Sequence, residues 1–120
     1  MRRDDLIRLR HMLEAAQLVQ QFTAGRKRAD LDRDTQLVLA LCRCIEIIGE
    51  AASKVSEEAK SALAGLPWRE MVAMRNRLIH AYFDVDLRLL WETAENDIPS
   101  LVAGLPRIID SGSSDAGSGS

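Results

Sequence analysis

The residues of this chain that could carry out chemistry are concentrated in one short segment, "RNRLIHAY", which contains Arg75, Asn76, Arg77, His80 and Tyr82. A neutral imidazole can take the proton from an RNA 2′-hydroxyl or return one to a leaving oxygen. An arginine can bind the scissile phosphate and offset charge that develops on its oxygens. The residue types therefore suit metal-independent cleavage of RNA. The simpler alternative is a histidine at a helix end that bonds a backbone carbonyl.

The spacing of Arg75 and His80 limits how they could act together. Five positions on an ideal helix correspond to about 140° around the axis, so the two residues do not share a face. Asn76 and His80, one turn apart, do share one. Arginine and histidine can meet one phosphate if the helix ends or loosens near His80, or if a second subunit completes the site.

Other kinds of catalytic site have little support in the sequence. Metal-binding helical bundles use carboxylates with Glu-x-x-His pairs, and neither His11 nor His80 follows a glutamate by three positions. Glu46 and Glu50 lie one turn apart on one face and are expected to pair or hydrogen-bond at an interface, so no metal site is predicted. Phosphate-binding glycine loops and a Gly-x-Ser-x-Gly elbow are absent, and no cofactor is expected.

Apolar residues repeat at threes and fours along most of the chain, which is typical of amphipathic helices. A first helix is expected over about residues 4–24 and stops at Gly25, and an aspartate, Asp32 or Asp34, caps the second. A short helix capped by Ser56 follows. The next helix has Pro67 in its first turn and carries the motif.

The last helix of about two dozen residues is expected after a cap at Asp84 or Asp86, and Pro99 and Pro106 should kink or end it. The pattern predicts an all-α, up-and-down bundle of four main helices plus a short extra helix. This domain spans residues 1–110, and residues 111–120 form a flexible Gly/Ser-rich tail.

The composition fits one globular domain. The chain has 120 residues, 47% of them hydrophobic, and a net charge of -2, which excludes a generally basic nucleic-acid coat but not a small basic site. The charged N-terminus lacks the apolar core of a signal peptide, and the longest apolar run, residues 37–42, is too short to cross a bilayer. A soluble, cytoplasmic protein is predicted. Cys42 and Cys44 point about 200° apart on a helix, so they are expected to be small core residues.

The motif and its surroundings resemble the HepT-like toxins of the HEPN superfamily. Arg75-x4-His80-x-Tyr82 matches that family's Arg-x(4–6)-His-x-Tyr motif, with the spacer at its short end. The segments "IEIIGEAASKVS", "PWREMVAMRNRLIHAYFDVD" and "LLWETAENDIPSL" also look like the family's recurring segments. The likeness extends over about residues 4–109. It implies a HEPN-type helical bundle that forms a homodimer, with the motif of each subunit facing a cleft at the interface.

The resemblance also implies a function. Such proteins are metal-independent ribonucleases that act as toxins of type VII toxin–antitoxin pairs, and a minimal, MntA-like nucleotidyltransferase antitoxin transfers AMP from ATP to the motif tyrosine. By position, Arg75 would contact the phosphate, His80 would be catalytic and Tyr82 would accept AMP. Asn76 and Arg77 would support the site. The alternative is a non-catalytic HEPN module that binds a nucleotidyltransferase partner or a nucleotide.

Overall fold

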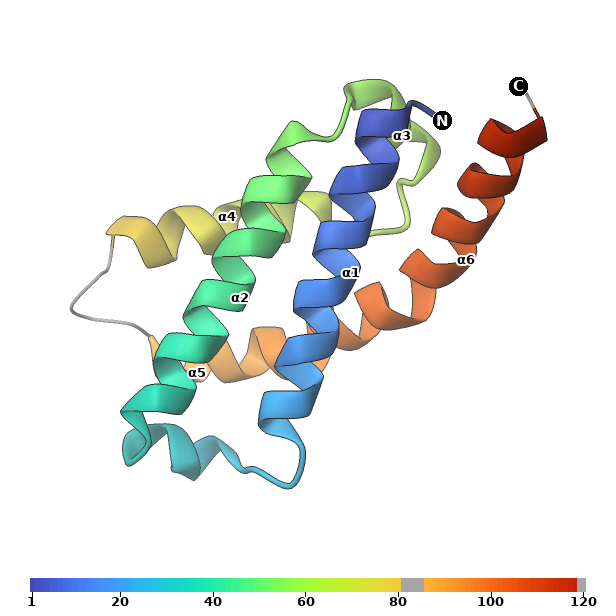
Figure 1. Cartoon of the computed structure of the whole chain (residues 1–120). Coiled ribbons are helices and arrows are strands. Elements are labelled where there is room, and N and C mark those ends of the chain that lie inside the picture. Colours follow the sequence, from blue (N-terminus) through green and yellow to red (C-terminus); the bar gives the residue numbers. More distant parts are fainter. Residues whose placement is uncertain (81–85, 119–120) are drawn as a thin grey trace.

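Four long helices form the molecule, as the sequence predicts. The computed structural model describes the backbone of residues 1–80 and 86–118, and the side chains of residues 1–77 and 86–112. Helices α1 and α2 lie side by side and antiparallel, α4 crosses α2, and α6 packs on α1 (Figure 1). The helices in chain order are α1 (Arg3–Thr23), α2 (Thr35–Lys54), α3 (Glu57–Ala62), α4 (Trp68–His80), α5 (Leu87–Glu92) and α6 (Ile98–Ser118). The all-α fold class is confirmed.

Local capping residues set the ends of the first three helices. Gly25 has φ +71° just after α1, a left-handed conformation that favours glycine. The side chain of Asp34 accepts a hydrogen bond from Leu37 N at 3.0 Å, so Asp34 is the cap of α2. Ser56 Oγ accepts from Ala59 N at 3.1 Å at the start of α3. The predicted stop and caps are therefore correct.

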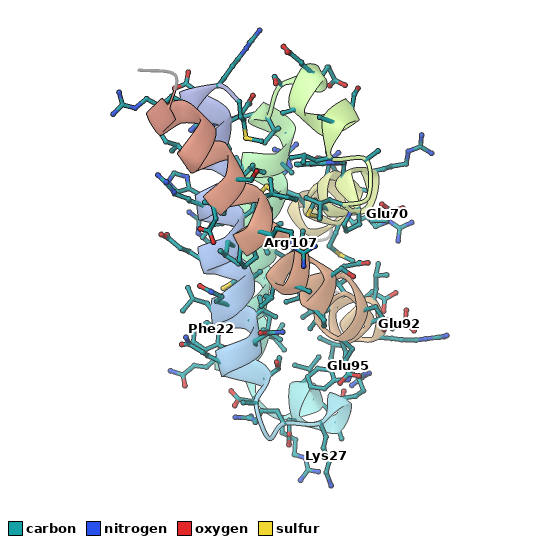
Figure 2. The ribbon with its side chains drawn as sticks, turned by 90° about the vertical axis from the view of Figure 1, so that its right-hand side faces the viewer. Phe22, Lys27, Glu70, Glu92, Glu95 and Arg107 are labelled. Atoms are coloured by element: carbon teal, nitrogen blue, oxygen red, sulfur yellow. The ribbon has the colours of Figure 1, made fainter. Side chains whose placement is uncertain are left out.

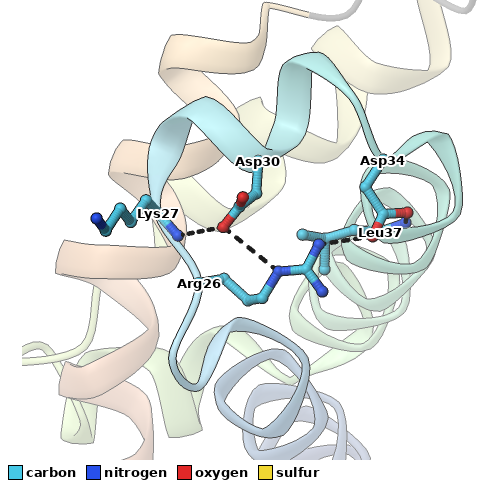
Figure 3. A network of polar contacts seen from close by, with 5 residues as sticks. All are labelled: Arg26, Lys27, Asp30, Asp34 and Leu37. Carbon is cyan, nitrogen blue, oxygen red and sulfur yellow. Dashed lines mark hydrogen bonds and ion pairs between the residues drawn. The ribbon is translucent and has the colours of Figure 1, made fainter.

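The connection between α1 and α2 contains a 3₁₀ helix, Arg28–Asp32, held by a polar network (Figure 3). Arg26 donates to Asp34 Oδ2 at 2.6 Å and pairs with Asp30 Oδ2 at 3.4 Å. The backbone N–H of Lys27 donates to the same Asp30 oxygen at 2.7 Å. The hydrogen bond from Arg26 lowers the pKa of Asp34, and the Lys27 N–H lowers the pKa of Asp30. Asp30 and Asp34 thus hold Arg26 and the ends of the connection together.

The last helical stretch is longer than predicted. Asp86 caps α5 by accepting from the N–H at position 89, and Asp84 lies outside the described residues. A π-helical segment, Thr93–Asp97, joins α5 to α6, and the chain changes direction between α5 and the C-terminal part of α6 (Figure 1). Of the two predicted effects of the prolines, a kink or an end, an end does not occur at Pro106, because the helix continues through it. Leu101 and Leu105 on α6 are fully buried, and this packing holds the helix on both sides of Pro106.

Helix α6 is described up to Ser118, including residues 111–118 of the predicted tail. Gly112 is buried, and a Cβ atom there would lie 3.0 Å from a terminal methyl of Leu6 on α1. The packing of α6 against α1 thus continues to position 112, beyond the predicted domain end at residue 110. The division into a domain and a flexible tail stays a prediction.

The core is formed by the apolar stripes that the sequence shows. Side chains from α1, α2 and the α5–α6 stretch pack together in this core. No helix within residues 1–80 and 86–118 is long and apolar enough to span a membrane. The largest side chains with almost no exposed surface are Leu9, Met12, Val19, Leu41, Ile48, Leu90, Ile98, Leu101 and Leu105.

Candidate active site

Helix α4 carries the candidate site and is anchored at its start. Trp68 is half-buried against the core, and its Nε1 donates to the backbone carbonyl of Leu63 at 2.9 Å. Met71 and Met74 are buried on the side that faces α2. Trp68, Met71 and Met74 thus all pack on the core. These contacts fix α4 upstream of the motif residues.

Arg75 lies at the contact of α4 with α2. Its side chain is half-buried, and the first carbons of that side chain lie against the backbone of Gly49 in the middle of α2. Because arginine can bury its aliphatic stem while its guanidinium stays at the surface, this position leaves the charge available to a ligand. The glycine contact was not predicted from the sequence. The one signal for it is a glycine within the strongest helical pattern of the chain.

Asn76 holds the guanidinium of Arg75. Its Oδ1 accepts hydrogen bonds from Arg75 Nη2 at 2.9 Å and from Nε at 3.3 Å. Among the described residues no acceptor lies on Nη1, the end of the fork that can still bind a phosphate oxygen. The supporting role predicted for Asn76 therefore has a geometric basis, an acceptor that orients Arg75.

Arg77 and His80 also lie on α4. Arg77 is exposed and makes no ion pair with another described side chain. His80 is the last residue of α4, and the backbone is helical throughout from Arg75 to His80. The helix therefore does not end between them. The side chain of His80 and the whole of Tyr82 lie outside the described residues.

Asn76 partly offsets the awkward spacing of the motif. On an ideal helix position 76 lies about 100° from position 75 and about 40° from position 80. By accepting from the guanidinium of Arg75, Asn76 draws that group towards the side of α4 on which position 80 lies. The guanidinium of Arg75 therefore points closer to the direction of position 80 than the roughly 140° between the two positions on an ideal helix indicates.

The other candidate polar residues have ordinary roles. Glu46 pairs with Arg43 at 3.4 Å and Glu50 with Lys54 at 3.5 Å, as predicted for polar pairs along α2. His11 is exposed on α1. Within residues 1–80 and 86–118, no three His, Cys, Asp or Glu side chains are grouped as metal ligands would be.

Cys42 and Cys44 are buried, unpaired and part of the core, as predicted. Burial raises the pKa of Cys42 to about 11, with a smaller contribution from the charge of Glu46. Burial also raises the pKa of Cys44. Both thiols therefore stay protonated near neutral pH and are poor nucleophiles.

Acidic and basic side chains are mixed on the face seen in Figure 2. Glu70 in the first turn of α4, Glu92 on α5 and Glu95 in the π segment are seen there together with Lys27 and Arg107, and Glu92 pairs with Arg88 at 3.2 Å. Burial raises the pKa of Asp97, and the charge of Glu70 raises it further.

The cavity between α1, α3 and α6 is not the site of the motif. It has a volume of about 440 Å³, and its lining includes Asp5, Ser56, Arg107 and Ile108. None of the described motif residues, Arg75, Asn76 and Arg77, contributes to its lining.

The fold and the motif define a class of protein, the helical-bundle ribonucleases of the HEPN type. The chain belongs to the family described as "Ribonuclease HepT-like", whose model matches residues 12–108. Family membership places the chain among RNA-cleaving enzymes and confirms the resemblance recognised in its motif.

Individual relatives agree with this assignment. The chain is 44% identical over 93 residues to "Probable ribonuclease HepT" of Thermococcus cleftensis, covering 78% of this chain and 84% of that protein. It is 35% identical over 101 residues to a protein of Caldanaerobacter subterraneus subsp. tengcongensis named "Putative RNase", covering 84% and 90% of the two chains. A "Gamma-glutamylcyclotransferase and putative RNase" of Methanocaldococcus jannaschii is 38% identical over 110 residues, 92% of this chain but 50% of that protein. No solved structure gives a significant match.

Proposed function

We propose that this chain is the toxin of a toxin–antitoxin pair, a metal-independent endoribonuclease whose reaction is carried out by Arg75 and His80. The observation that carries the proposal is the complete Arg-x4-His-x-Tyr motif of the sequence, with Arg75 on α4 held by Asn76 and its Nη1 end open among the described residues. Membership in the HepT-like ribonuclease family supports the substrate, RNA.

The proposed reaction needs only the RNA and the protein side chains. Neutral His80 accepts the proton of the 2′-hydroxyl, and the 2′-oxygen attacks the adjacent phosphorus. The bond from phosphorus to the 5′-oxygen of the next nucleotide breaks, and that oxygen takes a proton from an imidazolium. Arg75 binds the non-bridging oxygens as negative charge grows on them. The products are a 2′,3′-cyclic phosphate and a 5′-hydroxyl end.

The proposal includes a homodimer in the cytoplasm. The resemblance implies that two motifs face one cleft, and a two-fold axis would place two copies of α4 close together. The dimer therefore rests on the resemblance.

Tyr82 is proposed as the point of control. A minimal, MntA-like nucleotidyltransferase antitoxin would transfer AMP from ATP to the Tyr82 hydroxyl and release pyrophosphate. The added group brings bulk and a negative phosphate two residues from His80, where an RNA phosphate would otherwise bind. Like charge and occlusion both oppose binding of the substrate.

Cleavage is tested by expressing the wild type and His80→Ala without antitoxin while growth and RNA integrity are followed. His11→Ala is the matched control, because it removes the other histidine of the chain from an exposed position. The wild type and His11→Ala are expected to arrest growth and degrade RNA, and His80→Ala is not. Intact RNA with the wild type, together with tight association with a nucleotidyltransferase, would instead favour the non-catalytic HEPN module.

The modification is tested by intact-mass measurement after incubation with the antitoxin and ATP. Wild-type protein is expected to gain mass in steps of one AMP group and to lose its cleavage activity. Tyr82→Phe should keep its original mass and remain active. Mass increments that persist in Tyr82→Phe would contradict the assignment of Tyr82.

A further inference from the structure

Helices α2 and α4 make their closest approach at Gly49. A Cβ atom built at position 49 would come nearer than 3.0 Å to the Cβ of Arg75, a separation that real Cβ atoms essentially never show. It would also lie 2.9 Å from the backbone carbonyl oxygen of Met71 and 3.2 Å from the Cγ of Arg75. The atoms that would clash are a backbone oxygen and the root of a side chain. Neither can rotate away.

The glycine has no conformational reason to be there. Gly49 lies in the interior of α2 with an ordinary helical backbone, where glycine stabilises a helix less than alanine does. The buried neighbours Ile48 and Ala52 on α2 pack normally. Glycine therefore differs from alanine at this position because glycine allows α4 to lie this close to α2.

Two contacts together determine where the guanidinium of Arg75 lies. Gly49 receives the first carbons of the side chain, and Asn76 accepts from Nε and Nη2 at the other end. The backbone at position 49 thus sets the depth at which the side chain starts, and Asn76 sets its direction. We infer that Gly49 is a positioning residue for Arg75 in the RNA-cleaving reaction, an inference that rests on the proposed function.

Alanine at position 49 would displace Arg75. To bring the contact with Met71 from 2.9 Å to the ordinary range that begins at 3.4 Å, α4 must move away from α2 by at least about 0.5 Å. A shift of this size at a group that stabilises a transition state lowers the rate steeply, since misplacement by about 1 Å can reduce it roughly a hundredfold.

The test is the rate of RNA cleavage by purified Gly49→Ala, with Gly104→Ala as the matched control. Gly104 lies in α6, and a Cβ atom there would meet only a terminal methyl of Leu66 at 3.3 Å, which can move. Gly49→Ala is expected to lower kcat by about tenfold to a hundredfold with a smaller change in KM. Gly104→Ala should stay within about twofold of the wild type by the same reasoning.

A second measurement separates positioning from loss of folded protein. The same Gly49→Ala change is made in Arg75→Gly, which lacks both the guanidinium and the Cβ that would clash. In the Arg75→Gly background, Gly49→Ala should lower the residual rate less than it lowers the rate of the wild type. It should also lower the melting temperature less. Rates are measured below each melting temperature, with sucrose added where a variant needs it to stay folded.

The outcomes separate this inference from the proposed function. If the wild type does not cleave RNA, the proposed function fails. If the wild type cleaves and Arg75→Gly keeps only a small residual rate, but folded Gly49→Ala keeps the wild-type kcat, only the role of Gly49 is wrong. Equal losses in Gly49→Ala and Gly104→Ala, or an equal loss of residual rate in the Arg75→Gly background, would also overturn it.

Discussion

Asn76 and Arg75 are adjacent in the chain, yet the side chain of one holds the charge of the other. Neighbouring residues on a helix do not face each other, and the contact forms because the guanidinium of Arg75 turns sideways along α4. The Oδ1 atom of Asn76 accepts from Nη2 at 2.9 Å and from Nε at 3.3 Å. This sideways orientation brings the positive charge towards the side of α4 that position 80 occupies.

Asn76→Ala is therefore expected to lower the cleavage rate without unfolding the protein. The guanidinium would lose its acceptor and sample other directions, and a loss of about tenfold in kcat is expected for a misdirected charge. Asn96→Ala is the control, because Asn96 is an exposed asparagine in the π segment. Steady-state kinetics on a defined RNA measure both. Unchanged kcat in Asn76→Ala would show that Asn76 does not orient Arg75 during the reaction.

Helix positions and caps could be predicted because they depend on local residues. Gly25, Asp34 and Ser56 act on backbone groups within three or four positions of themselves. The continuation of α6 through Pro106 could not be predicted, since it depends on side chains such as Leu105 that are buried against other helices. Tertiary packing overrode the local preference.

The motif of the site could also be found in the sequence, but not the contacts that arrange it. The types and spacing of the motif residues identified α4 as the candidate. The contact between Gly49 and Arg75 joins residues 26 positions apart on different helices, and no local pattern specifies it. The residues that orient a functional group are thus harder to predict than the group itself.

Asp5 is a second residue whose role depends on a distant partner. It is only 4% exposed, and it accepts hydrogen bonds from Ser56 N at 2.8 Å and from Ser56 Oγ at 2.7 Å. Asp5→Ala is expected to lower the free energy of unfolding by about 1–2 kcal/mol, because the part-buried N–H and hydroxyl of Ser56 would lose their partner. Asp4→Ala is the control, since Asp4 is exposed one position earlier.

Urea denaturation at neutral pH measures both aspartate variants. The unfolding midpoint should fall in Asp5→Ala and change little in Asp4→Ala. Equal midpoints in the two variants would mean that the link between the start of α1 and the cap of α3 contributes nothing to stability.

The two cysteines are expected to resist thiol reagents in the folded protein. Burial raises the pKa of Cys42 to about 11 and also raises the pKa of Cys44, so little thiolate is present at pH 8. A disulfide reagent such as Ellman's should react slowly with the native protein. After the protein is unfolded in urea, the reagent should react readily with both thiols. Rapid reaction of one native thiol would contradict the protonated, buried state described for it.

The same shift predicts loss of stability in alkali. A raised pKa in the folded state means that the unfolded chain releases its thiol protons first, so stability falls as the pH rises above about 9 towards the folded value near 11. Cys42→Ala should reduce this decline. The midpoint of urea unfolding, compared at pH 8 and pH 10, tests it, and identical declines in the two proteins would exclude Cys42 as a cause.

Asp34 gives a prediction in acid, with the opposite sign. The hydrogen bond from Arg26 lowers the pKa of Asp34 in the folded protein, so the ionised form stabilises the fold above the ordinary aspartate pKa of about 3.9. This stabilisation is lost as the pH falls through the lower, folded value. Asp34→Asn should keep the helix cap, since asparagine caps about as well as aspartate. It should also show a weaker dependence of stability on pH below about 5.

Asp32→Asn is the matched control for Asp34→Asn, because Asp32 lies two positions away and makes a single exposed pair with Arg28 at 3.0 Å. Such a pair contributes little to stability. Urea midpoints at pH 7 and pH 3 are compared for the wild type and both variants. The difference between the two pH values should shrink in Asp34→Asn and stay near that of the wild type in Asp32→Asn. If Asp34→Asn loses as much stability in acid as the wild type does, the contact between Arg26 and Asp34 is not a source of the acid sensitivity.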